Sequence, residues 1–204
     1  HSVFGAINDT QQKYGIFGLL NIPASARLSF SLGARGAQQN NSLQQSIGTT
    51  NTINHAVATT AGAALQLNAN TKIYLRRAES FRFPKADENA ATPLGVTALK
   101  TQKGAAYETG VKCNWQKFIT KFSLYQLNLH DEIAFDPTQT ATQPFGANRN
   151  LAPTIRRGFS LSEKFAITDK VTFGGQYNYV NARFQNGINS GKRIPLVAEN
   201  ILHA

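Results

Sequence analysis

The chain has 204 residues, of which 41% are hydrophobic and 16% are charged, and its net charge is +10. No stretch approaches the roughly 20 consecutive apolar residues of a membrane-spanning helix, so a helical membrane protein is excluded. The charged fraction is low beside the roughly 25% of an ordinary soluble domain. Lys and Arg are scattered, and no aromatic–basic motif of an RNA-binding module accompanies them, so we expect no nucleic-acid partner.

The cysteine and histidine residues indicate neither a disulfide nor a metal site. The single Cys113 cannot form an internal disulfide, and no Cys/His cluster has the spacing of a zinc site. We therefore expect no cofactor and no metal. The sequence starts at His1, contains no Met and carries no signal peptide. Because an exported protein needs such a signal, we interpret residues 1–204 as a fragment of a longer protein.

Apolar and polar residues alternate in segments of about ten residues, the pattern of tilted membrane-spanning β-strands. Over residues 171–183, for example, Val171, Phe173 and Tyr177 share one parity, and Thr172 and Gln176 have the other. Alternation is equally clear over 27–35, 57–67 and 105–115, and it is interrupted, as by bulges, over 13–21, 71–81, 118–133 and 155–165. A ninth strand is predicted to start at Leu196, and we expect little or no helix.

The predicted connections alternate in length. Short ones cover residues 22–26, 68–70, 116–117 and 166–169, and long ones cover 38–54, 82–103, 135–153 and 184–195. In an up-and-down meander every second connection lies at the same end of the sheet. The sequence therefore predicts an all-β antiparallel meander of about nine strands with short turns at one end and long loops at the other, as in outer-membrane barrels. Aromatic residues suited to the membrane interfaces are Tyr107, Trp115, Phe118, Phe165, Tyr177 and Tyr179.

Four stretches, in order, resemble the barrel of TonB-dependent outer-membrane receptors. The longest is Leu99–Phe135, LKTQKGAAYETGVKCNWQKFITKFSLYQLNLHDEIAF, with its Tyr-Glu-x-Gly strand, tight turn and returning strand. The others are YLRRAESFRFPKADE (Tyr74–Glu88), NRNLAPTIRRGFSL (Asn148–Leu161) and NARFQNGINSGKRIPLVAEN (Asn181–Asn200). Residues 13–35 also match a typical earlier hairpin of the family.

This resemblance implies a function and a location. It implies part of a barrel of about 22 strands in the bacterial outer membrane, with the plug domain and the final strands absent from the fragment. It further implies import of a ferric siderophore, or of cobalamin or haem, driven by TonB through the missing plug. The alternatives are a passive porin or secretion barrel, and a soluble β-rich binding module.

Arginines near the long loops are the candidate ligand contacts, because guanidinium forks suit anionic chelates. The candidate substrate-binding residues are Arg76, Arg77, Phe81, Arg82, Arg156 and Arg157. The alternative interpretation is that these arginines pair with acids in the lumen or with lipopolysaccharide phosphates. A metal site at His130–Glu132 is less favoured than a solvated strand end. Since His1, His55, His130 and His203 lie in no catalytic motif, we do not expect an enzyme.

Overall fold

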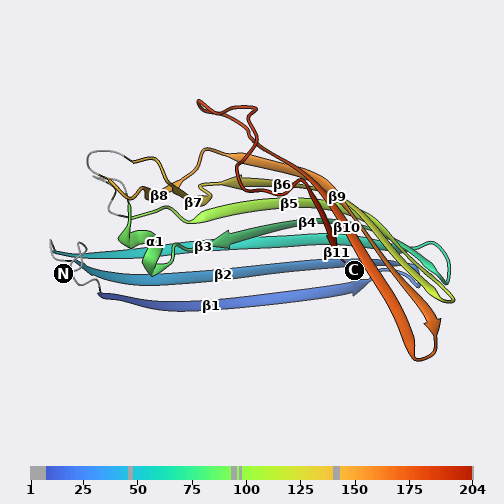
Figure 1. The fold of residues 1–204 in the computed structure, drawn as a ribbon. Coiled ribbons are helices and arrows are strands. Elements are labelled where there is room, and N and C mark those ends of the chain that lie inside the picture. Colours follow the sequence, from blue (N-terminus) through green and yellow to red (C-terminus); the bar gives the residue numbers. More distant parts are fainter. Residues whose placement is uncertain (1–7, 46–47, 93–95, 97, 140–142, 204) are drawn as a thin grey trace.

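The computed structural model describes residues 8–45, 48–92, 96, 98–139 and 143–203. Nine strands form one antiparallel sheet with the order β1-β2-β3-β4-β5-β6-β9-β10-β11. Their bounds are β1 (Asn8–Pro23), β2 (Leu28–Gln45), β3 (Gly48–Gln66), β4 (Thr71–Arg82), β5 (Gln102–Trp115), β6 (Phe118–His130), β9 (Thr154–Thr168), β10 (Val171–Phe184) and β11 (Asn200–His203). The predicted nine-stranded meander is confirmed, and Figure 1 shows it as one curved, open sheet.

The long connections carry the remaining elements. Helix α1 (Ala86–Ala90) lies between β4 and β5, and a two-stranded sheet of β7 (Ile133–Asp136) and β8 (Ala147–Asn150) lies between β6 and β9. Figure 1 shows all three at the end of the sheet opposite the short turns. None of the helices in the described residues is both long and apolar enough to cross a membrane.

The short turns close by local hydrogen bonds. Gln116 and Lys117 form a two-residue hairpin, in which Gln116 adopts a φ of 40° that suits the twist of the flanking strands. The turn between β3 and β4 is held by the Asn68 side chain, whose Oδ1 accepts a hydrogen bond from the Asn70 amide at 2.9 Å. The type and length of each turn fix the register of the two strands that it joins.

Two predicted boundaries are wrong. The long loop over 38–54 is instead a continuation of β2 and β3, which pair down to Gln45 and Gly48 with residues 46–47 outside the described part. The segment is rich in Gln, Asn, Ser and Thr, so it lacks apolar alternation. Its backbones nevertheless pair fully, and even its buried side chains include the polar Gln39 and Asn41. The last strand begins at Asn200 rather than at Leu196, which is fully exposed with a φ of 61°.

The register places apolar residues on one face of the sheet, here called the outer face. A continuous cross-strand row on it is Ile22, Phe30, Ala63, Leu75, Thr109, Leu124, Phe159 and Tyr179. The adjacent row on the opposite, inner face is Asn21, Ser31, Gly62, Arg76, Glu108, Tyr125, Gly158 and Val180. This is the apolar-out, polar-in division of a membrane barrel.

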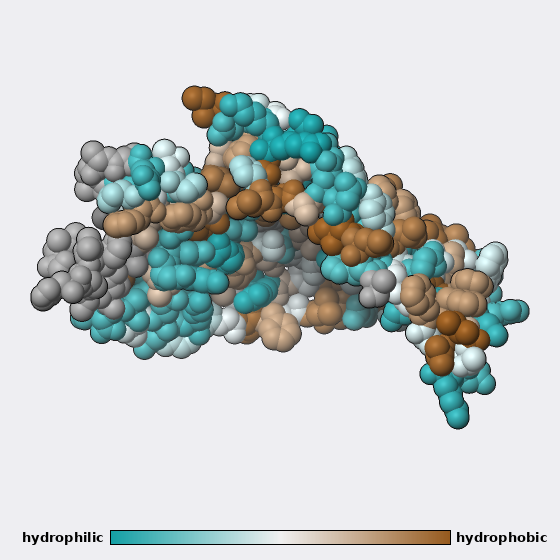
Figure 2. Space-filling model, in the orientation of Figure 1, coloured by the Kyte–Doolittle hydropathy of each residue, from teal (hydrophilic) through white to brown (hydrophobic). Residues whose placement is uncertain are grey.

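The outer face is apolar and exposed over many strands. Leu32, Leu75 and Leu124 are 49%, 62% and 50% exposed, respectively. Soluble monomers rarely expose large apolar side chains side by side over so many strands. Trp115, Phe118 and Phe165 gather at the short-turn edge of this belt, where Phe118 and Phe165 stack with centroids 4.6 Å apart. Figure 2 shows hydrophilic residues over the loop-side ends of β1 and β2, beyond the belt.

Candidate ligand-binding surface of the inner face

The loop after β4 folds onto the inner face of the sheet. Gln39 on β2 donates from Nε2 to the Pro84 carbonyl at 3.1 Å, and Gln11 on β1 donates to the same oxygen at 3.4 Å. Phe83 and Pro84 are buried there, as are Ala56 on β3 and Gln39 on β2. The loop is therefore packed into a small core on the loop-side ends of β1–β3.

A second loop, between β6 and β9, is tied to the first by asparagine side chains. Asn150 both accepts from the Lys100 amide at 2.8 Å and donates to the Lys100 carbonyl at 3.0 Å. Asn148 donates from its side chain to the Glu88 carbonyl at 3.1 Å and from its backbone to the Ala91 carbonyl at 2.7 Å. The two loops therefore form one hydrogen-bonded roof.

Ion pairs fix this roof to the strands. The Arg82 Nη1 atom at the end of β4 lies 2.7 and 2.8 Å from the two carboxylate oxygens of Glu88 in α1. The Arg156 Nη2 atom on β9 lies 2.7 Å from the Glu132 carboxylate, which also accepts from the Thr154 hydroxyl at 3.0 Å. Such charge-assisted hydrogen bonds are stronger than neutral ones. They hold the roof over the inner face.

Below the roof, β4 separates from β3. The last described register pair between them is Thr60 and Ala78, although β3 extends to Gly48. At the separation point the Glu79 carboxylate accepts from the Thr59 amide at 3.0 Å and from the Thr59 hydroxyl at 2.7 Å, replacing the lost backbone acceptor. A groove of about 600 Å³ opens there between β1–β3 and β4.

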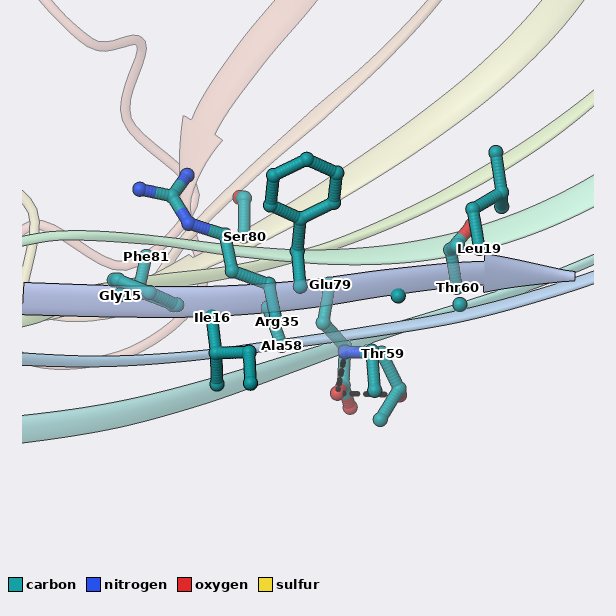
Figure 3. A pocket seen from close by; sticks show the side chains of 14 residues that line it. Gly15, Ile16, Leu19, Arg35, Ala58, Thr59, Thr60, Glu79, Ser80 and Phe81 are labelled. Atoms are coloured by element: carbon teal, nitrogen blue, oxygen red, sulfur yellow. Dashed lines mark hydrogen bonds between the residues drawn. The ribbon is translucent and has the colours of Figure 1, made fainter.

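Arg35 is the charged group of this groove on the inner side. Figure 3 shows Arg35 and Ser80 on one side of the sheet, with Ile16 and the Thr59–Glu79 hydrogen bonds on the other. The Arg35 guanidinium lies 5.1 Å from the centroid of the Phe81 ring and makes no ion pair with any described residue. A free guanidinium beside an aromatic ring can receive an anionic, planar group.

The structure divides the six predicted contact residues between the faces. Arg76 lies on the inner face with 55% of its side chain exposed, 4.0 Å from Glu108. Arg77 lies on the outer face, where it pairs with Glu79 at 2.7 Å and stacks on Tyr107.

Phe81 has the parity of the outer face, but its ring lies under Arg35 and 5.3 Å from the Phe83 ring. Arg157 lies on the outer face and donates to Gln126 at 2.8 Å. Arg82 and Arg156 serve the roof as described above. Of the six residues, Phe81 lies beside the groove's guanidinium, which belongs to Arg35, a residue outside the predicted set. Ligand contact by the six residues stays a prediction.

Sequence reasoning missed Arg35 as a candidate. The signal was present, since Arg35 has the polar parity of β2 and stands at the loop-side end of an otherwise small, uncharged row. Arg35 was not selected because the long loop was predicted to begin three residues later, at Gln38, and Arg35 was therefore interpreted as the end of a strand. In the His130–Glu132 run, His130 ends β6, Asp131 has a φ of 53° in the connection to β7, and Glu132 is engaged by Arg156.

Comparison with known proteins identifies the class. Residues 3–203 match the family model of the TonB dependent receptor-like β-barrel. The chain therefore belongs to the β-barrels of TonB-dependent receptors, which lie in the bacterial outer membrane and are transporters rather than enzymes. This assignment favours a receptor over the passive porin and the soluble module considered above.

Solved structures show the same fold. The ferric-catecholate import receptor Fiu of E. coli K12 and the siderophore receptor PiuA of Acinetobacter baumannii each have a TM-score of 0.75 and 16% identity, with 96% of this chain covered. The ferric yersiniabactin uptake receptor FyuA of Yersinia pestis has a TM-score of 0.72 and 16% identity over 95% of this chain. The chain spans 32%, 31% and 30% of Fiu, PiuA and FyuA, respectively. A search of curated protein sequences finds no match.

Proposed function

We propose that this chain is the barrel portion of an energy-coupled receptor that imports a ferric siderophore or a similar metal chelate. The observation that supports this most is the Arg35 guanidinium, which makes no ion pair with a described residue and lies over the Phe81 ring in the groove between β1–β3 and β4. A cation beside an aromatic ring offers an anionic chelate, such as a ferric catecholate, both charge and a flat surface. Cobalamin and haem remain alternative cargo.

Arg76 and Phe81 are the proposed ligand contacts among the residues predicted from sequence, with Arg35 added. Arg82 and Arg156 would act indirectly, by holding the roof that closes the site from outside. Arg77 and Arg157, on the outer face, are not reached by a ligand in the lumen. Energy would enter through TonB acting on a plug domain inside the barrel, which is the partner that family membership implies.

A second proposed partner is lipopolysaccharide, on the outer face. Gln126, Arg157 and Asn181 form one cross-strand row directly above the apolar belt, and Arg183 follows on the loop side. Neither Arg157 nor Arg183 pairs with an acid among the described residues, so both can meet phosphate oxygens at the membrane surface. Arg157→Gln should reduce the lipopolysaccharide that copurifies with the receptor; unchanged copurification would refute this partner.

Binding and uptake of radioactive iron test the main proposal. Cells that express the full-length receptor would be given ferric complexes of a catecholate or a hydroxamate siderophore, with and without functional TonB. We expect TonB-dependent uptake of at least one complex and about tenfold weaker binding in Arg35→Met and Arg76→Met, the loss of roughly one charged contact. Arg77→Met removes the same charge from the outer face and should leave binding unchanged. Equal losses in all three variants would contradict the proposed site.

A further inference from the structure

Three lysines stand side by side on the inner face near the short turns. Lys72 on β4 is the register partner of Lys112 on β5, and Lys112 is the register partner of Lys121 on β6. We call these three residues the lysine row. Directly opposed side chains on neighbouring strands lie about 5 Å apart, so three like charges are held together across roughly 10 Å. Such an arrangement opposes strand pairing.

The described residues do not neutralise the row. None of its lysines makes an ion pair in the described part of the chain, and all three are exposed. Lys121 Nζ lies 5.8 Å from the centroid of the Tyr74 ring, which adds a weak attraction only. Glu108, two positions further along the inner face, is already engaged by the Tyr74 hydroxyl at 2.5 Å and by Arg76 at 4.0 Å.

The geometry points to a partner from inside the barrel. We propose that the lysine row docks an acidic polypeptide segment lying in the lumen, whose Asp or Glu carboxylates alternate with the three ammonium groups. In a closed barrel of this kind, partners reach the inner face only from the lumen. Exposed lysines at the short-turn end are mobile point charges that suit a protein surface with several carboxylates, whereas a small chelate is oriented better by the rigid forks of arginine near the roof.

Zero-length carbodiimide crosslinking tests this docking directly. Outer membranes containing the full-length receptor would be treated, and crosslinked peptides would be identified by mass spectrometry. We expect isopeptide bonds from at least two lysines of the row to Asp or Glu side chains of a luminal segment. No crosslink from the row would overturn the proposal, whatever the receptor transports, because this readout does not depend on the ligand.

Amine acetylation gives a second, independent readout. The row should react at least tenfold more slowly in the intact receptor than in the unfolded chain, whereas Lys100 in the exposed loop should not. Protection that disappears after dialysis, without crosslinks, would indicate a small anion and would contradict a polypeptide partner.

A charge reversal with a matched control separates docking from general effects of charge. Lys112→Glu should reduce crosslinking from Lys72 and Lys121 at least fivefold, because it repels the incoming carboxylates. Lys103→Glu makes the same change on the same strand but on the outer face. It should leave those crosslinks unchanged, and an equal loss in both variants would refute the specific role of the row.

Discussion

Replacing Arg156 by Met should release the loop between β6 and β9. The Arg156 and Glu132 side chains are only 16% and 18% exposed, and their closest atoms lie 2.7 Å apart. A hydrogen bond between charged groups contributes about 1.5–3 kcal/mol, and the uncompensated Glu132 left behind adds to the loss. The free energy of opening this loop should therefore fall by about 2 kcal/mol, which corresponds to a roughly 30-fold larger population of the open state.

Hydrogen exchange of the full-length receptor, followed by mass spectrometry of peptides from residues 131–153, measures this change. Arg157→Met is the matched control, because it removes the neighbouring arginine from the outer face, where its partner is Gln126. That control should leave exchange of the loop unchanged. A double-mutant cycle with Glu132→Gln would show whether the two side chains act together. Unchanged exchange in Arg156→Met, or equal acceleration in both single variants, would refute the role assigned to this pair.

Two further predictions concern packing and pH. Gly158→Ala should destabilise the barrel by about 1–3 kcal/mol, because the new Cβ would collide with the Tyr179 carbonyl oxygen. In the control Gly36→Ala, the new Cβ meets no atom within 4 Å, so the substitution should cost little. Equal midpoints of thermal unfolding in the two variants would contradict this prediction. Hydrogen bonds from Thr138, aided by Arg149, lower the pKa of Asp136. Because this pKa is depressed in the folded state, the stabilisation of the β7–β8 hairpin is present above the ordinary Asp pKa and is lost as the pH falls through the lowered one. Exchange of the hairpin should therefore rise in that acidic range and be less pH-dependent there in Asp136→Asn.

Membrane-spanning strands could be predicted because lipid on one face and the lumen on the other require apolar and polar residues to alternate with a period of two. Residues such as Phe173 and Tyr177 show the lipid-facing parity without any tertiary information. The polar extensions of β2 and β3 could not be predicted in this way. Beyond the membrane the inner face is covered by the folded loop and still carries polar residues such as the buried Gln39, so Gln38 and its neighbours show no apolar alternation although their backbones pair fully.

The candidate site was only partly predictable for a different reason. Adjacent arginines such as Arg76 and Arg77 must point to opposite faces of a strand, and period 2 could have separated them. Which arginine stays free depends on long-range contacts. Arg156 meets Glu132 across a loop, and Arg35 meets Phe81 only because β4 leaves β3 after Ala78. Neither contact has a local sequence signal.

The central claim is that the outer face of this sheet meets lipid while the inner face lines a lumen. Leu32 and Ser31 are neighbours on β2 and have opposite parities. Each would be replaced by Cys, with Cys113→Ser as background, and labelled with a fluorophore in the reconstituted full-length receptor. We predict that a nitroxide on the lipid acyl chains quenches the label at residue 32 and not the label at residue 31. Equal quenching at both positions, or none at residue 32, would contradict the account.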